Sequence, residues 1–192
     1  AEPGIWAATL KNRDGSPAAT PLRPPLAQGR VRFVGEPVAV VVADTLAQAK
    51  AAAEAIEIDY DELEPHLALA PGGPAIYDDV PDNVAFDWGF GDAEATEAAF
   101  AGAARVVTGR IENNRIICAS MEPRGCFAEW DEDRLHLCFN GQGVWHMKGE
   151  LARMLGLDEG LVRITNPDVG GGFGMKGQSY PEHVFIPVAA KL

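Results

Sequence analysis

The sequence predicts an α+β protein of two units, and three observations support this class. Residues 37–43 (PVAVVVA) form a β-branched run typical of a strand, and an alanine-rich stretch with helical periodicity follows them. Residues 126–139 contain two short segments in which apolar and polar side chains alternate. Residues 71–95 are rich in Pro, Gly, Asp and Asn, the composition of a domain boundary. Each half therefore mixes short strands with helices.

The first unit, residues 1–78, is predicted to contain a strand–helix–strand layer. The run at 37–43 is apolar on both sides, as in a strand buried on both faces. Thr45 and Gln48 have the spacing of a capping box and predict a helix start. Residues 56–60 then alternate Ile and Tyr with acidic side chains, the pattern of a half-exposed strand.

The second unit, residues 105–192, is predicted to open with strands. Residues 106–117 are interpreted as a strand that leads into a turn. Segments 126–130 and 135–139 flank a short polar stretch, which predicts a β-hairpin.

The remainder of this unit is predicted to be helix, strand, loop and helix. Residues 144–155 form the first helix, and Gly156 stands where a left-handed C-terminal cap belongs. Residues 161–165 are a short strand, and residues 181–192 have a helical pattern. Pro187 interrupts that pattern, so we expect the last helix to be kinked or displaced.

Composition excludes several classes of protein. The 192 residues are 47% hydrophobic and carry a net charge of −12, which disfavours nucleic acid or an anionic membrane as a partner. No apolar run is long enough to span a membrane. Three cysteines without CxxC spacing favour a reducing, cytoplasmic location. The sequence starts without Met and its last helix has no cap, so we expect a fragment of a longer protein.

The middle of the chain is strongly acidic. Between Lys50 and Arg105 there are 13 Asp and Glu residues and no Lys or Arg. Residues 79–104 are interpreted as an acidic linker between the units, since a run of like charges is usually a solvated face. The alternative is that the acidic segment 54–97 is the docking surface of a non-catalytic subunit-interaction domain.

The densest signal is a glycine loop at residues 168–177, in which four of the five positions from 170 to 174 are glycine. Such density indicates backbone with positive φ or close approach to a ligand, and bare N–H groups suit oxyanions. Gly172, Gly174 and Gly177 also fit G-x-G-x-x-G, so an NAD- or FAD-binding module is an alternative that requires a helix starting at the loop. A turn needed only for packing is the third interpretation.

Four motifs in order resemble one family, the large subunits of molybdenum hydroxylases (xanthine dehydrogenase, aldehyde oxidase and aerobic carbon monoxide dehydrogenase). They are VGEPVAVV at 34–41, MEPR at 121–124, GQ at 141–142, and the glycine loop with Lys176. The resemblance implies an α/β hammerhead domain at 1–78. The start of a molybdopterin-binding domain would then occupy 105–192.

The resemblance assigns cofactor-binding roles to five residues. It implies that Gln142 donates a hydrogen bond to an oxo ligand of molybdenum, since an amide donates without adding charge. It implies that the loop approaches the metal and the pterin through backbone N–H groups of Gly171, Gly172, Phe173 and Gly174. Without the motif order, Gln142 would be interpreted as a turn residue and Phe173 as a core aromatic. No residue of this chain is expected to ligate the metal.

Other motif residues carry weaker expectations. Lys176 could neutralise a cofactor phosphate or be solvated, and Glu122 and Arg124 are expected in structural ion pairs or turn contacts. Purine-oxidising members of the family carry a glutamate where this sequence has Gly177, so recognition of xanthine is not expected. The four histidines form no spaced cluster and are interpreted as structural or surface residues, and the three cysteines are interpreted as buried apolar residues or free thiols.

The implied function is that of an oxidoreductase using a molybdenum–molybdopterin cofactor, with or without an appended nucleotide. It would hydroxylate an aldehyde, a heterocycle or a similar small carbon substrate, or oxidise carbon monoxide, with water as the oxygen source. The resemblance implies 2Fe–2S clusters and FAD on partner subunits or domains. The family's catalytic glutamate falls outside these residues, so this chain alone is predicted to be inactive.

Overall fold

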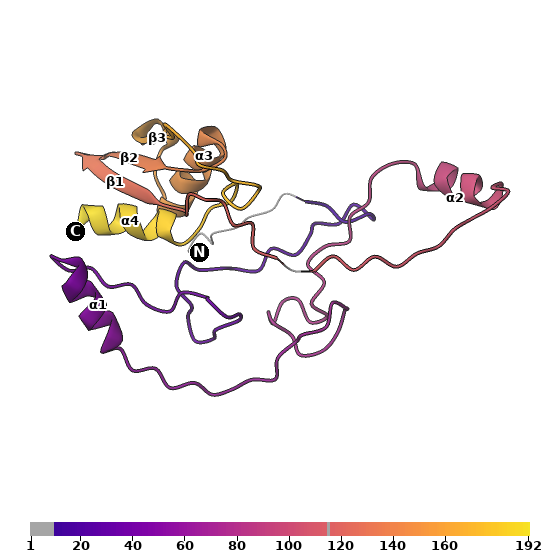
Figure 1. Ribbon diagram of the computed structural model, residues 1–192, viewed down its shortest axis with the longest axis horizontal. Helices are drawn as coiled ribbons and strands as arrows, with labels where there is room; N and C mark the ends of the chain where they lie inside the picture. Colours follow the sequence, from indigo (N-terminus) through magenta and orange to yellow (C-terminus); the bar gives the residue numbers. More distant parts are fainter. Residues whose placement is uncertain (1–9, 115) are drawn as a thin grey trace.

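The computed structural model describes residues 10–114 and 116–192. Figure 1 shows one folded lobe, which we call the C-terminal lobe (residues 120–192), and a long open path taken by the preceding chain, here called the N-terminal segment (residues 10–114). The elements in chain order are α1 (Leu46–Glu54), α2 (Ala93–Ala101), β1 (Cys126–Asp131), β2 (Arg134–Phe139), α3 (Val144–Leu155), η1 (Glu159–Leu161), β3 (Val162–Thr165) and α4 (Glu182–Lys191).

The C-terminal lobe is built on a three-stranded sheet of order β1–β2–β3. β1 pairs antiparallel with β2 from Cys126↔Phe139 onward, through a two-residue loop in which Glu132 has φ 54°. β3 pairs parallel with β2, and α3 forms the crossover that a parallel connection requires. The predicted hairpin and the short predicted strand at 161–165 are therefore confirmed.

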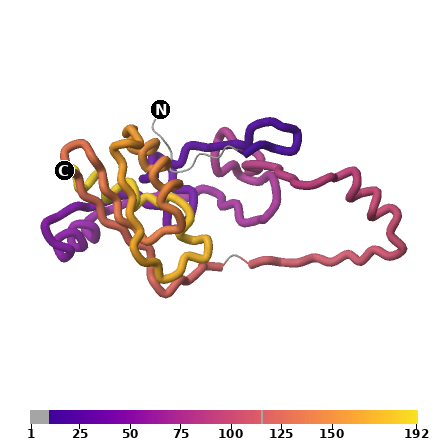
Figure 2. The backbone as a smooth tube through the Cα atoms, turned by 90° about the horizontal axis from the view of Figure 1, so that it is seen from above, coloured from indigo at the N-terminus to yellow at the C-terminus, as the bar shows by residue number. Residues whose placement is uncertain are grey.

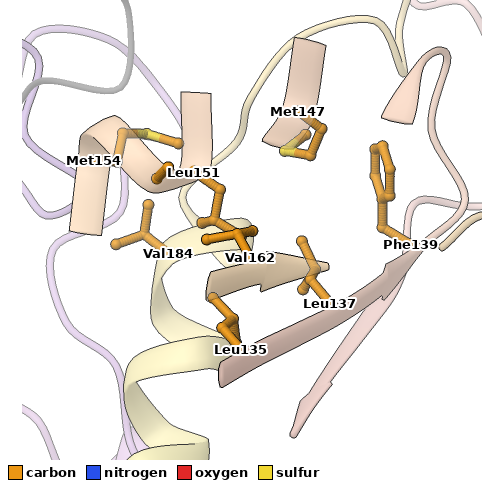
Figure 3. Close-up of a cluster of buried hydrophobic side chains, with 9 residues drawn as sticks. Leu135, Leu137, Phe139, Met147, Leu151, Met154, Val162 and Val184 are labelled. Carbon is orange, nitrogen blue, oxygen red and sulfur yellow. The ribbon is translucent and has the colours of Figure 1, made fainter. Parts of the chain in front are cut away.

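The core lies between one face of this sheet and the helices α3 and α4 (Figure 3). Alternate residues of β2 point into it, and Leu135 and Leu137 are fully buried against Leu151 of α3. Gly156 ends α3 in the left-handed conformation at φ 66°, which confirms the predicted helix and its cap. The other buried core residues are Phe139, Met147, Ala152, Met154, Val162 and Val184.

The last helix, α4, packs beside β1 and contains Pro187. The chain stays helical on both sides of this proline, whose side chain is fully buried. Proline leaves a carbonyl one turn earlier without its usual donor. The indole Nε1 of Trp130 donates to the Pro187 carbonyl at 2.8 Å, which ties the helix to β1 at this point.

The N-terminal segment corrects several expectations. Residues 37–43, 56–60 and 106–117 are not strands where the structure describes them. Val40 is 49% exposed, although the pattern predicts burial on both faces. β-Branched alternation favours extended backbone, but a strand also needs a hydrogen-bonding neighbour, and no described segment pairs with these. The predicted strand–helix–strand layer is therefore absent among the described residues.

Two helices stand in the N-terminal segment without burying any residue. α1 has the predicted capping box, with Gln48 N–H donating to Thr45 Oγ1 at 3.2 Å. α2 was not predicted, because it falls in the stretch interpreted as an acidic linker. Asp92 caps it by accepting from the Ala95 N–H at 2.9 Å, so local capping and alanine propensity account for it.

Figure 2 shows the chain from above, with the stretch that carries α2 extending away from the lobe and residues 102–114 leading back toward it. None of the helices in the described ranges has the length and apolarity needed to cross a lipid bilayer. The fold places the loop between β3 and α4 at one end of the lobe.

Candidate cofactor site

The glycine loop leaves β3 and turns through residues in the left-handed region. Gly171, Phe173 and Gly174 have φ of 96°, 51° and 84°. Left-handed residues within a turn direct successive backbone N–H groups to one side and form an anion-binding concavity. The next helix begins only at Glu182, so the loop is not a helix N-terminus. The geometry required by the NAD- or FAD-binding alternative is therefore missing.

Three consecutive backbone donors of this loop have no acceptor. The N–H of Gly170 donates to Glu122 Oε2, and the N–H of Gly174 donates to Gln142 Oε1. Between them, the N–H groups of residues 171–173 make no hydrogen bond within the described part of the chain. A row of unpaired donors requires water or a ligand to satisfy it.

Gln142 lies directly against this loop. Its Oε1 accepts from the N–H of Gly174 at 2.9 Å and from that of Lys176 at 3.2 Å, and its own backbone N–H donates to the Lys176 carbonyl at 3.0 Å. A Cβ at Gly172 would stand 2.5 Å from Gln142 Oε1, so only glycine allows this approach. Because two amides hold the oxygen, the side-chain NH₂ is the end that remains for a ligand.

Phe173 does not belong to the core. Its side chain is 74% exposed, and it has positive φ, an unusual conformation for an aromatic residue. Strained backbone of this kind gathers at ligand sites. The ring lies over Gly171, where a Cβ would meet it at 2.9 Å. The interpretation of Phe173 as a core aromatic is therefore wrong, and the ring projects beside the unpaired amides.

Lys176 is neither solvated nor available to a phosphate. It is 3% exposed, and its Nζ lies 2.8 Å from Glu122 Oε2. The hydrogen bond from this lysine, followed by that from Gly170 N–H, holds the pKa of the Glu122 carboxyl below its ordinary value. Both expectations for Lys176 are thus corrected, and Glu122 is confirmed in a structural ion pair.

Arg124 links the MEPR turn, which also contains Glu122, to α4. Its Nε donates to Glu182 Oε1 at 2.7 Å, and its guanidinium stands 3.7 Å from the centre of the Tyr180 ring. The Tyr180 hydroxyl in turn donates to the Met175 carbonyl. Beside this arrangement lies an open hollow of about 380 Å³, whose lining includes Cys118, Ser120, Arg124 and Met175.

The histidines and cysteines take no part in the loop. His136 bridges the strands, with Nδ1 2.7 Å from Glu129 and Nε2 2.8 Å from Thr165. His183 is buried, and all three cysteines are free. In the described ranges, no three His, Cys, Asp or Glu side chains form a group that could hold a metal ion.

The structure brings Gln142 and all four loop residues of the predicted site together. Sequence reasoning missed the part of Glu122, which contacts both Gly170 and Lys176. No short-range spacing links residue 122 to a loop some 50 positions away. Only the occurrence of MEPR ahead of the glycines could have pointed to it.

The matching family models define the class of this chain. Residues 76–192 match the model described as molybdopterin cofactor-binding domain. Residues 7–64 match the model described as aldehyde oxidase and xanthine dehydrogenase, a/b hammerhead domain, although none of the described residues in this range belongs to a sheet. The chain therefore belongs to the xanthine dehydrogenase, aldehyde oxidase and carbon monoxide dehydrogenase large-subunit family.

Two relatives are similar to most of this chain but extend well beyond it. The chain is 40% identical over 177 residues to the nicotine 6-hydroxylase large subunit of Paenarthrobacter nicotinovorans, covering 88% of this chain and 21% of that protein. It is 34% identical over 183 residues to the carbon monoxide dehydrogenase large chain of Hydrogenophaga pseudoflava, covering 86% of this chain and 23% of that protein. The chain thus spans about a fifth to a quarter of these relatives.

A solved structure shares the fold. A crystal structure of the Cu,Mo-containing carbon monoxide dehydrogenase in its carbon monoxide-reduced state matches with a TM-score of 0.73 and 29% identity. The match covers 90% of this chain and 24% of that one. At 90% coverage, the match includes most of the N-terminal segment as well as the lobe.

Proposed function

We propose that this chain supplies one wall of the molybdenum-cofactor site in a hydroxylase large subunit. The observation that carries the proposal is the meeting of two donor sets: the unpaired N–H groups of residues 171–173, and the NH₂ of Gln142, whose side chain lies against Gly172 and whose oxygen is already held by the loop. Both are neutral donors. A cofactor rich in acceptor oxygen and sulfur atoms fits such a wall, whereas a cationic ligand does not.

The residues present would hold and orient the group. Gln142 Nε2 would donate to an acceptor on the metal, and the backbone N–H groups of residues 171–173 would bind the adjoining acceptors. The exposed ring of Phe173 would cover the site and exclude water. When bound, the cofactor would supply the oxygen- and electron-transfer chemistry, and the chain would supply orientation and electrostatics.

The proposed activity is hydroxylation of an aldehyde, a heterocycle or a similar small carbon substrate, or oxidation of carbon monoxide, with water as the oxygen source. Relatives named nicotine 6-hydroxylase and carbon monoxide dehydrogenase support this range. Gly177 lacks the carboxylate that purine recognition would use. The family's catalytic glutamate would come from outside these 192 residues, so the chain alone should be inactive.

The proposal extends to partners and location. Electrons would leave through 2Fe–2S clusters and FAD on partner subunits or domains. A relative named as a subunit of a 6-hydroxypseudooxynicotine dehydrogenase complex supports a multi-subunit assembly. Three free cysteines suit a cytoplasmic protein. The chain would divide into the hammerhead domain at 1–78, the acidic linker at 79–104 and the cofactor-binding portion at 105–192.

Metal analysis tests the proposal directly. The gene product that carries this sequence, purified from a host that makes the cofactor, should contain molybdenum and molybdopterin. A well-folded product that contains neither would contradict the proposed function.

A substitution tests the assigned donor. Gln142→Ala should lower turnover about 10- to 100-fold, the usual cost of removing a partner next to a metal centre, while the protein still folds. Gln178→Ala is the matched control, since this glutamine is exposed and lies outside the donor set. Unchanged turnover in Gln142→Ala would remove Gln142 from the site.

A further inference from the structure

A single carboxylate joins the two ends of the glycine loop. Glu122 Oε2 accepts from the N–H of Gly170, where the loop begins, at 2.7 Å. The same oxygen lies 2.8 Å from the Nζ of Lys176, where the loop ends. The backbone N–H of Glu122 also donates to the Gly170 carbonyl at 3.3 Å. Glu122, which belongs to the MEPR turn, therefore closes the loop into a ring by linking residues 170 and 176.

The lysine end of this ring is fixed by burial. The Lys176 side chain is 1% exposed, whereas that of Glu122 is 35% exposed. A buried ammonium without a partner carries a heavy desolvation cost. Lys176 therefore stays in place only while the Glu122 carboxylate faces it, and the backbone of residue 176 stays with it.

The backbone of Lys176 is what orients Gln142. Its N–H donates to Gln142 Oε1, and its carbonyl accepts from the Gln142 N–H. If residue 176 shifts, the amide oxygen of Gln142 loses one of its two donors and can rotate. A rotated amide would present oxygen, and not NH₂, to an acceptor on the ligand.

We propose that Glu122 is a positioning residue for the cofactor wall: it holds Lys176 and Gly170, and through Lys176 it sets the direction of the Gln142 amide. In this role it acts through its contacts with Lys176 and Gly170 and not through the cofactor or the substrate. The inference rests on the proposed function for its consequence in the loaded protein. The ring closure itself is a property of the chain and can be measured without cofactor.

The first experiment uses the cofactor-free chain. Glu122→Ala should speed amide hydrogen exchange at Gly174 and Lys176 by about 10-fold or more, the expected effect of losing a charge-assisted hydrogen bond. Glu150→Gln is the matched control, because Glu150 is also a partly buried carboxylate, paired with Arg153 at 2.9 Å on α3. Exchange at the loop should not change in the control. Unchanged exchange in Glu122→Ala would overturn the proposal.

A double variant separates positioning from simple charge compensation. Glu122→Ala with Lys176→Met removes the carboxylate and replaces the ammonium by an unbranched apolar side chain that can stay buried. The melting temperature should return toward that of the original chain, while loop exchange stays about 10-fold faster. Loop exchange that returns to the original rate would overturn the proposal, and it would do so even if Glu122→Ala alone fails to fold.

The loaded protein provides the second readout. In the gene product carrying this sequence, the double variant should retain molybdenum about 10- to 100-fold more weakly, and its Mo(V) electron paramagnetic resonance spectrum should differ from that of the unsubstituted protein. An unsubstituted protein without molybdenum would refute the proposed function and leave the exchange test standing. Unsubstituted and variant proteins with equal retention and identical spectra would refute only the role of Glu122.

Discussion

The two regions of this molecule have similar fractions of hydrophobic residues and use them differently. The C-terminal lobe encloses nine buried hydrophobic residues in one cluster. Within the described N-terminal segment, only Ala18 and Val80 are buried hydrophobics. The accessible surface of the chain is 14,330 Å², whereas a compact monomer of its mass would expose about 9,000 Å².

The difference shows that strand-forming sequence is not sufficient for a strand. β2 has neighbours on both edges within 30 residues, and its alternate leucines meet α3. Residues 37–43 have the stronger β pattern, yet no described strand pairs with them, and within the described ranges their one backbone hydrogen bond comes from the Ala27 N–H, which donates to the Pro37 carbonyl at 2.8 Å. The solved dehydrogenase that matches this chain is about four times longer than the matched region. Local preference becomes secondary structure where the chain also provides the partner.

Amide hydrogen exchange should expose the largest contrast. Amides of β2 are expected to exchange at least about 1000-fold more slowly than those of residues 37–43, because only the former open through loss of the core. Mass spectrometry of the chain measures both regions in one experiment. Equal protection of β2 and residues 37–43 would show that the two regions do not differ in stability.

Core truncation should act on one region only. Leu151→Ala, at a fully buried position, should lower the free energy of unfolding of the lobe by about 2–5 kcal/mol. Val40→Ala, at a half-exposed position, should change it by less than about 0.5 kcal/mol. Urea titration followed by Trp fluorescence compares them, and a larger loss for Val40→Ala would show a hidden core in the N-terminal segment.

Cysteine reactivity should sharpen the boundary between the regions. Burial raises the pKa of the Cys126 thiol to about 11, with the Glu182 charge adding to the shift, whereas Cys118 is exposed. At about pH 8, Cys126 should react with iodoacetamide about 100-fold more slowly than a solvent-exposed cysteine in an unfolded peptide. Peptide mapping should find Cys118 modified first, and the reverse order would contradict the assigned burial.

The smallest expected effect is a pH dependence of the lobe. Burial is the main cause that lowers the pKa of His183; Arg124 also lowers it, while Glu182 opposes the shift. The neutral ring accepts from the Tyr180 N–H at 3.1 Å, packs edge-on to Phe139, and would lose that bond on protonation.

The lowered pKa of His183 determines in which direction stability changes with pH. The unfolded chain binds the proton first, so the stability contributed by neutral His183 is complete above about pH 6.5 and is lost as pH falls from there through the folded pKa. Melting temperatures between about pH 7.5 and 5.0 should fall more steeply for the unsubstituted chain than for His183→Gln. Parallel slopes would remove His183 as the cause.

Much of the lobe could be predicted from sequence because its signals are local. The hairpin, α3 and the Gly156 cap all depend on residues within a few positions of each other. Lys176 was misjudged for the opposite reason: its partner, Glu122, lies 54 residues earlier. The contact between Gln142 and the loop likewise has no signal in periodicity or charge, and only the order of motifs linked them.

The loop glycines also differ in what they would tolerate during sequence divergence. At position 172 a Cβ would stand 2.5 Å from Gln142 Oε1, so even alanine would require the Gln142 side chain to move. At position 174 nothing lies within 4 Å of a Cβ, and only the positive φ restricts the choice. Asparagine, which accepts that backbone, could replace Gly174 while the same exchange two positions earlier would dismantle the wall.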